Sequence, residues 1–257
     1  MHATEIHTIR PPSRLLVLGE LRAAWEHMAG LAAWPMLQMA PRGNGQRVLV
    51  LPGLLAGDRS THLLRLFLRT RGYKVHGWGL GRNLGPRPSI EQGMVDKLRS
   101  LYEESGRKVS LVGWSLGGIY ARRLAMQYPE WVRDVISLGS PVAGSPHATN
   151  AWRVYERVSG RKADDPQRLR MIHQTPPVPT TSIYSRTDGV VALQCSVEQV
   201  GPQTENIEVF ASHTGLGAHP AVLYAVADRL SLPEGQWRAF DRQLLGPLVY
   251  PDPARAA

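Results

Sequence analysis

Cysteine is nearly absent from this sequence of 257 residues, in which Cys195 is the only one. A single cysteine cannot form an internal disulfide, so the sequence gives no reason to expect an oxidising compartment. We expect Cys195 to be a small buried residue that packs like an apolar side chain.

Long apolar runs are also missing. No stretch approaches the roughly 20 consecutive apolar residues that a membrane-spanning helix requires, so we expect no integral membrane segment. Residues 1–35 lack the uninterrupted apolar core of a signal peptide, because four polar residues interrupt it: Glu20, Arg22, Glu26 and His27. These absences predict a cytoplasmic protein.

Lysine is scarce, so arginine carries most of the formal net charge of +9. The basic residues are spread along the chain and no nucleic-acid-binding motif accompanies them, so we expect a solvated surface rather than a nucleic-acid site. Metal-ligand spacings and internal repeats are absent. No helix opens directly after the glycine-rich segment 81–86, so we expect a structural loop there rather than a phosphate loop. We therefore expect no metal and no cofactor.

The most informative feature that is present is a serine between glycines. Residues 113–118 read Gly-Trp-Ser-Leu-Gly-Gly, follow the apolar run 109–112 and precede a helical pattern at 119–128. Such a tight strand-to-helix turn forces its central residue into strained backbone angles, and the flanking glycines leave room for a reactant. This context favours Ser115 as an activated nucleophile over a plain glycine-rich turn.

A serine nucleophile needs a histidine base and a carboxylate that orients the histidine. Asp188 follows the β-branched segment 180–184, which predicts a strand, although an Asp-Gly turn without catalysis is an alternative interpretation. His213 follows a second predicted strand at 207–210. His219 is the alternative base, but its place before Pro220 favours a role at the start of a helix.

Strands and helices alternate from Val48 onward, which predicts an α/β fold with a mostly parallel sheet of about six strands flanked by helices. The length fits a single domain, residues 1–257, with an N-terminal helical extension at 1–45. Residues 145–176 interrupt the alternation with a helical pattern and a charged stretch. This segment is either a cap over the site or a decorative insertion.

The N-terminal extension contains apolar residues at helical spacing: Leu18, Leu21, Trp25, Met28 and Ala32. This spacing predicts an amphipathic helix. Its polar positions mix acids with a base, whereas helices that lie on membranes are rich in Lys and Arg. We therefore expect its apolar side to pack on the core.

Four segments, 48–55, 113–118, 184–189 and 212–217, together resemble the α/β-hydrolase superfamily, and within it the lipase- and esterase-like members. The resemblance covers residues 46–232, and the chain order Ser115, Asp188, His213 is the order of that family. It implies an oxyanion hole formed by the backbone amides of Leu54 and Leu116. The loop before Leu54 departs from the family pattern, because Pro52-Gly53 stands where His-Gly is usual.

The resemblance and the residues together predict a serine hydrolase that cleaves carboxylic esters of a small molecule or a lipid through an acyl-enzyme. An acyltransferase or a thioesterase would use the same triad. A non-catalytic binding protein with a hydrolase fold is a further alternative, because a fold does not dictate a function. The sequence does not separate these, and it does not indicate an oligomeric state.

Overall fold

The computed structural model of the chain describes residues 9–243, 246 and 248–252. Six parallel strands form one sheet in the order β2-β1-β3-β4-β5-β6, which confirms the predicted fold class. The strands are β1 (Arg47–Leu51), β2 (Lys74–Gly77), β3 (Val109–Trp114), β4 (Val132–Leu138), β5 (Thr180–Ser185) and β6 (Thr204–Val209).

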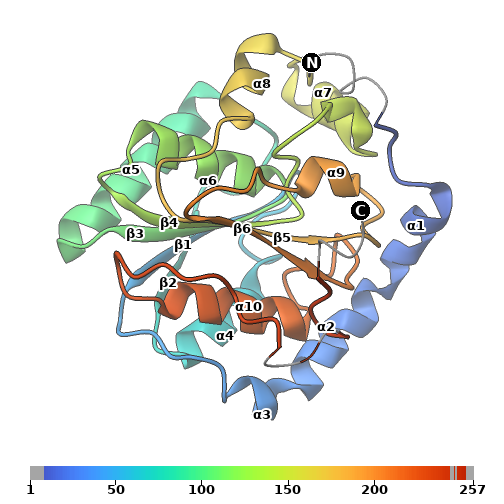
Figure 1. Cartoon of the computed structure of the whole chain (residues 1–257). Coiled ribbons are helices and arrows are strands. Elements are labelled where there is room, and N and C mark those ends of the chain that lie inside the picture. Colours follow the sequence, from blue (N-terminus) through green and yellow to red (C-terminus); the bar gives the residue numbers. More distant parts are fainter. Residues whose placement is uncertain (1–8, 244–245, 247, 253–257) are drawn as a thin grey trace.

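Helices cover both faces of this sheet (Figure 1). One face carries α4 (His62–Thr70) and α10 (Pro220–Ser231), and the other carries α5 (Pro88–Ser105) and α6 (Leu116–Gln127). Each pair of helices packs on the sheet through its own buried apolar cluster. Strands that are buried on both faces read as nearly continuous apolar runs, which is why 48–51 and 109–112 are readable from the sequence.

The polypeptide between β4 and β5 contains η2 (Pro146–Ala148), α7 (Trp152–Ser159) and α8 (Pro166–Ile172). These elements lie together at one end of the molecule, away from α4 and α10 (Figure 1). They correspond to the predicted interruption at 145–176. The short helix α9 (Leu193–Ser196) follows β5 and contains Cys195, which is buried and free, as expected.

The N-terminal extension is helical, as predicted, with α1 (Arg14–Gly19), η1 (Glu20–Arg22), α2 (Ala23–Ala32) and α3 (Trp34–Leu37). Residues 1–8 of the predicted extension lie outside the described residues. The packing prediction for this segment is wrong. Its apolar residues face outward, with Leu21 80% and Trp25 78% exposed, whereas the buried positions of α2 are Glu26 and Gly30.

The inward side of α2 is polar because it meets polar loops rather than the apolar core. Gly30 lies against the backbone at Ala218, where a Cβ would overlap the carbonyl oxygen. Among the described residues, no helix has both the length and the apolar character needed to cross a bilayer.

Candidate functional site

Ser115 occupies the turn between β3 and α6, at the carboxyl edge of the sheet. Its φ of +53° lies in the left-handed region, which is unfavourable for a residue with a Cβ. The turn is tight enough that a Cβ on Gly113 or Gly117 would overlap backbone atoms, at Gly117 and Leu51 respectively. Only glycine fits these two positions, so the predicted strained turn is present.

Asp188 and His213 come together although 25 residues separate them in the chain. His213 Nδ1 lies 2.7 Å from Asp188 Oδ2, and both side chains are buried. The loops that contain them follow β5 and β6, which are neighbours in the sheet with Ser185 paired to Val209. Parallel pairing therefore delivers both loops to the same edge.

The second oxygen of Asp188 is also engaged. Asp188 Oδ1 accepts hydrogen bonds from the backbone amides of Val190 and Val191, at 2.7 and 2.8 Å. These bonds fix the carboxylate and leave Oδ2 for the imidazole. Because the carboxylate accepts from Nδ1–H, the other ring nitrogen of His213 is free to accept a proton.

The Ser115 hydroxyl is not joined to this pair by a hydrogen bond, and within the described part of the chain it has no hydrogen-bond partner. The side chain of Trp114 links the two parts instead. Trp114 Nε1, one residue before Ser115, donates to the carbonyl oxygen of His213 at 3.0 Å. In ligand-free sites the bond between nucleophile and base is often long and forms with substrate bound.

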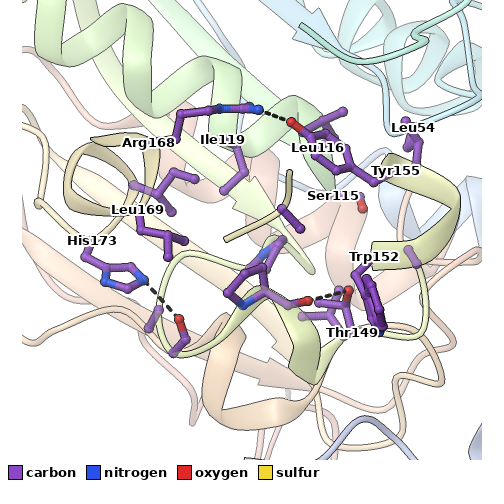
Figure 2. Close-up of a pocket in the computed structure, with 18 residues that line it drawn as sticks. Leu54, Ser115, Leu116, Ile119, Thr149, Trp152, Tyr155, Arg168, Leu169 and His173 are labelled. Carbon is purple, nitrogen blue, oxygen red and sulfur yellow. Dashed lines mark hydrogen bonds between the residues drawn. The ribbon is translucent and has the colours of Figure 1, made fainter. Parts of the chain in front are cut away.

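Leu54 and Leu116, the predicted oxyanion-hole residues, border the same pocket as Ser115 (Figure 2). Leu116 is the first residue of α6, so its amide has no partner within the helix. Gly53 packs against the serine, since a Cβ there would lie 3.3 Å from Ser115 Cβ. The loop thus approaches Ser115 closely despite its Pro-Gly sequence.

Asn83 holds that loop in place, a role that the sequence does not reveal. Its side-chain amide donates to the carbonyl oxygen of Pro52 at 2.9 Å. Its backbone carbonyl oxygen accepts from the backbone amide of Leu55 at 2.7 Å. Leu55 has φ +62°, and among the described non-glycine residues only Ser115 also has a positive φ. The glycine-rich segment 81–86, predicted to be a structural loop, therefore supports the bend of 52–56.

A pocket of about 100 Å³ opens at Ser115 and is walled mainly by apolar side chains. More than half of its lining residues come from the segment 145–176, so this segment forms much of the pocket wall (Figure 2). Arg168 of α8 lies at the wall, where its guanidinium is hydrogen bonded to the Tyr155 hydroxyl and stacks over the Tyr155 ring. Burial lowers the pKa of Arg168.

The loops of Asp188 and His213 are also bound by a carboxylate from the N-terminal segment. Glu20 accepts hydrogen bonds from the amides of Gly189, His213 and Thr214 and from the Thr214 hydroxyl, at 2.7 to 2.9 Å. Burial raises the pKa of Glu20, but these hydrogen bonds outweigh burial and hold the pKa below its usual value. One ionised side chain thus ties both loops together.

Glu26 and Arg22 extend this network. The Glu26 carboxylate accepts from the amide of Ser212 at 2.8 Å and from its hydroxyl, and Arg22 donates to both Glu26 and Thr187. In the sequence these residues stand out only because they interrupt an apolar run. Nothing local indicates that their partners lie more than 160 residues away.

The charges around His213 set its proton affinity. Burial lowers the pKa of His213, but the charge and hydrogen bond of Asp188 and the charge of Glu20 outweigh burial, so the pKa lies above its usual value. His219, the alternative base, instead accepts from the amide of Ala221 at the start of α10. Burial lowers the pKa of His219.

One group of side chains in the described residues has ligand atoms close enough to share a metal ion: His147, Glu156 and Asp164, with these atoms within 4.8 Å of one another. They belong to the segment 145–176. Glu156 already accepts from the amide of Ala163, and Lys162 Nζ lies 3.8 Å from its carboxylate. The negative charge of Glu156 is therefore partly balanced without a metal.

Sequence comparisons bear on this site. A family model described as "PGAP1-like alpha/beta domain" matches residues 81–214. A curated relative, the pimeloyl-[acyl-carrier protein] methyl ester esterase of Shewanella woodyi, is 27% identical over 110 residues. That match covers 43% of this chain and 42% of the relative, so the chain spans less than half of the relative's length.

Solved structures share the architecture. Lipase B of Aspergillus fumigatus superposes with a TM-score of 0.64 at 16% identity, over 81% of this chain and 58% of the lipase. A monoacylglycerol lipase of Paleococcus ferrophilus gives a TM-score of 0.51 at 18% identity, over 72% of this chain and 96% of that protein. These likenesses show the α/β-hydrolase fold.

Replacing Glu20 by Gln tests the network at the two loops. The variant removes a negative charge that stabilises the imidazolium, so we expect the pKa of His213, measured by NMR titration, to fall. It also replaces one of the two acceptor oxygens by an NH2 group, which cannot accept from a backbone amide. Oε1 accepts from Gly189 and His213, and Oε2 accepts from Thr214. We therefore expect hydrogen exchange to become about tenfold faster or more at the amides of one of these two sets.

The matched control is Glu103→Gln, which removes the same charge from an exposed ion pair on α5. We expect Glu103→Gln to leave the pKa of His213 and the exchange rates of the loop amides unchanged. Unaltered titration and exchange in Glu20→Gln would show that the carboxylate does not position these loops.

Proposed function

The chain belongs to the family of PGAP1-like alpha/beta domains within the α/β-hydrolase superfamily, and we propose that it is a serine hydrolase that cleaves carboxylic esters through an acyl-enzyme. The observation that supports this most strongly is the buried pair of Asp188 and His213, 2.7 Å apart. The pair is bonded through the His213 carbonyl oxygen to the residue that precedes a strained serine.

In the proposed reaction, the free ring nitrogen of His213, Nε2, takes the proton from Ser115 Oγ as this oxygen attacks the ester carbonyl carbon. Asp188 keeps the proton on Nδ1 and stabilises the imidazolium. The imidazolium then protonates the departing alkoxide, which leaves as the alcohol. Water attacks the acyl-enzyme with His213 again as base, which releases the acid and restores Ser115.

The oxyanion of the tetrahedral intermediate would be held by the amides of Leu54 and Leu116. Removing one such donor typically costs about 3 kcal/mol of transition-state stabilisation. Two features support this assignment. The Leu116 amide lies at the start of α6, where the helix dipole favours negative charge, and Asn83 fixes the loop that contains Leu54.

The pocket supports an apolar acyl group as the part of the substrate that it binds. Ile119, Leu169 and Ile172 are among its walls, and little of its surface is polar. A site of this kind gains affinity from buried apolar area, whereas a charged group would lose hydration there. The activity named for the Shewanella woodyi relative, ester hydrolysis, is in keeping with this proposal.

Replacing Ser115 by Ala is expected to lower kcat for ester hydrolysis by about 10⁴-fold or more, because no other group in the site would form the acyl-enzyme. The variant is also expected to lose labelling by a fluorophosphonate probe. Ser89→Ala, which removes an exposed serine from α5, is the control and should retain both. Equal labelling of Ser115→Ala and the wild type would refute the assignment of the nucleophile.

The pH dependence of kcat/KM tests the base. Neutral His213 is the active form, so the rate should rise with pH through a midpoint above about 6.5, the usual value for histidine. Asp188→Asn removes the negative charge that contributes most to raising the pKa of His213, while burial, which lowers this pKa, remains. We therefore expect the midpoint of the pH profile to move to lower pH. The rate itself should fall about 10⁴-fold, because the tautomer is no longer fixed.

Asp96→Asn, at an exposed position of α5, is the control and should leave the profile in place. A midpoint that is the same in Asp188→Asn and the wild type would mean that His213 does not act as the base in partnership with Asp188.

A further inference from the structure

The N-terminal segment exposes a broad apolar surface. Leu15, Leu18, Leu21, Trp25, Met28 and Leu31 are spaced three or four residues apart, and each is more than half exposed. We call these six residues the apolar face. They belong to α1, η1 and α2, helices that lie at the periphery of the molecule (Figure 1). Contiguous exposed apolar surface of this kind marks an interaction site in most proteins.

The orientation of this segment is the reverse of that of an ordinary surface helix. A surface helix buries its apolar side and exposes its polar side. Here Glu20, Arg22 and Glu26 are turned inward, where they bind the loops at 187–189 and 212–214. Those hydrogen bonds fix the rotation of the helices, so the apolar face is held outward by the fold rather than by chance.

The charged residues of the segment indicate which charge its partner carries. Within residues 9–42 the acidic residues are Glu20 and Glu26, and both carboxylates are bonded to the inner loops. The charged side chains that are exposed there are basic: Arg10, Arg14 and Arg42. The whole chain has a net charge of +9. The segment therefore exposes apolar side chains together with positive charge.

We propose that this face docks on a bilayer that contains anionic lipid, with α1 and α2 lying along the interface. Leu, Met and Trp side chains on an interfacial helix enter the boundary between headgroups and acyl chains, and nearby arginines bind anionic headgroups. A second copy of the chain is a poorer occupant, since symmetric pairing of this face would bring the arginines of both copies together. The earlier expectation against a membrane role rested on the acids, which the structure places on the inner side.

This docking does not require the proposed catalysis, so it can be measured in the full-length Ser115→Ala variant. The protein is mixed with vesicles of phosphatidylcholine alone, or with about one third phosphatidylglycerol, and bound protein is separated by flotation. We expect about tenfold tighter binding, or more, to the anionic vesicles, with the difference shrinking at high salt.

Two pairs of substitutions isolate the surface. Leu21→Ser with Trp25→Ser removes apolar area from the middle of the face, and is expected to weaken binding about tenfold or more. The control pair, Leu66→Ser with Val200→Ser, removes exposed apolar side chains from other parts of the chain and should bind as before. All four positions are exposed, so the fold is expected to tolerate these changes.

Arg10→Gln with Arg14→Gln should reduce the preference for anionic vesicles. The control pair, Arg99→Gln with Arg107→Gln, lies at exposed positions elsewhere and should not reduce it.

Absence of binding to either vesicle would overturn the proposal, and so would equal weakening by both pairs of serine substitutions. Analytical ultracentrifugation supplies the remaining test. A dimer that Leu21→Ser with Trp25→Ser dissociates would assign the face to a second copy instead.

Discussion

The buried hydrogen bond between Asp188 and His213 is the constraint on which the arrangement of the site depends. It forms at 2.7 Å only because the loops after β5 and β6 reach the same edge of the sheet in a fixed register. Each loop must also adopt one conformation, although loops are usually the most mobile part of a fold. Asp188 secures its own loop through two backbone amides, and Glu20 secures both loops from outside.

This dependence explains the unusual packing of the N-terminal helices. Their polar residues are needed on the inner side, because backbone amides of the loops there require acceptors. Once Glu20 and Glu26 face inward, helical periodicity forces Leu18, Leu21 and Trp25 outward. The same set of hydrogen bonds therefore orders the candidate catalytic loops and presents an apolar, cationic surface. A partner that binds this surface would therefore contact the same helices whose carboxylates bind the loops of Asp188 and His213.

Local patterns were sufficient to predict much of the fold and the candidate residues. Continuous apolar runs identified β1 and β3, and the glycines around Ser115 predicted its strained turn, since only a tight strand-to-helix connection needs them. The positions of Asp188 and His213 just beyond strands followed from parallel topology, which brings strand ends together. These inferences depend on neighbours in sequence or on one rule of sheet geometry.

Other features depend on contacts between distant segments, and the sequence did not reveal them. Periodicity shows which residues of a helix share a side, but it does not show which side meets the core, so the packing of Leu18 and Trp25 was predicted the wrong way round. Glu20 bonds to loops roughly 170 to 190 residues later, and Asn83 supports a bend 27 or more residues earlier. No local pattern marks either residue.

The account is tested most directly by a crystal structure of the protein after reaction with an alkyl phosphonate that mimics the tetrahedral intermediate. We expect phosphorus bonded to Ser115 Oγ, a phosphonyl oxygen within about 3 Å of the amides of Leu54 and Leu116, and His213 Nε2 within hydrogen-bond reach of the adduct. An adduct on another serine, or a phosphonyl oxygen turned away from both amides, would contradict the proposed chemistry.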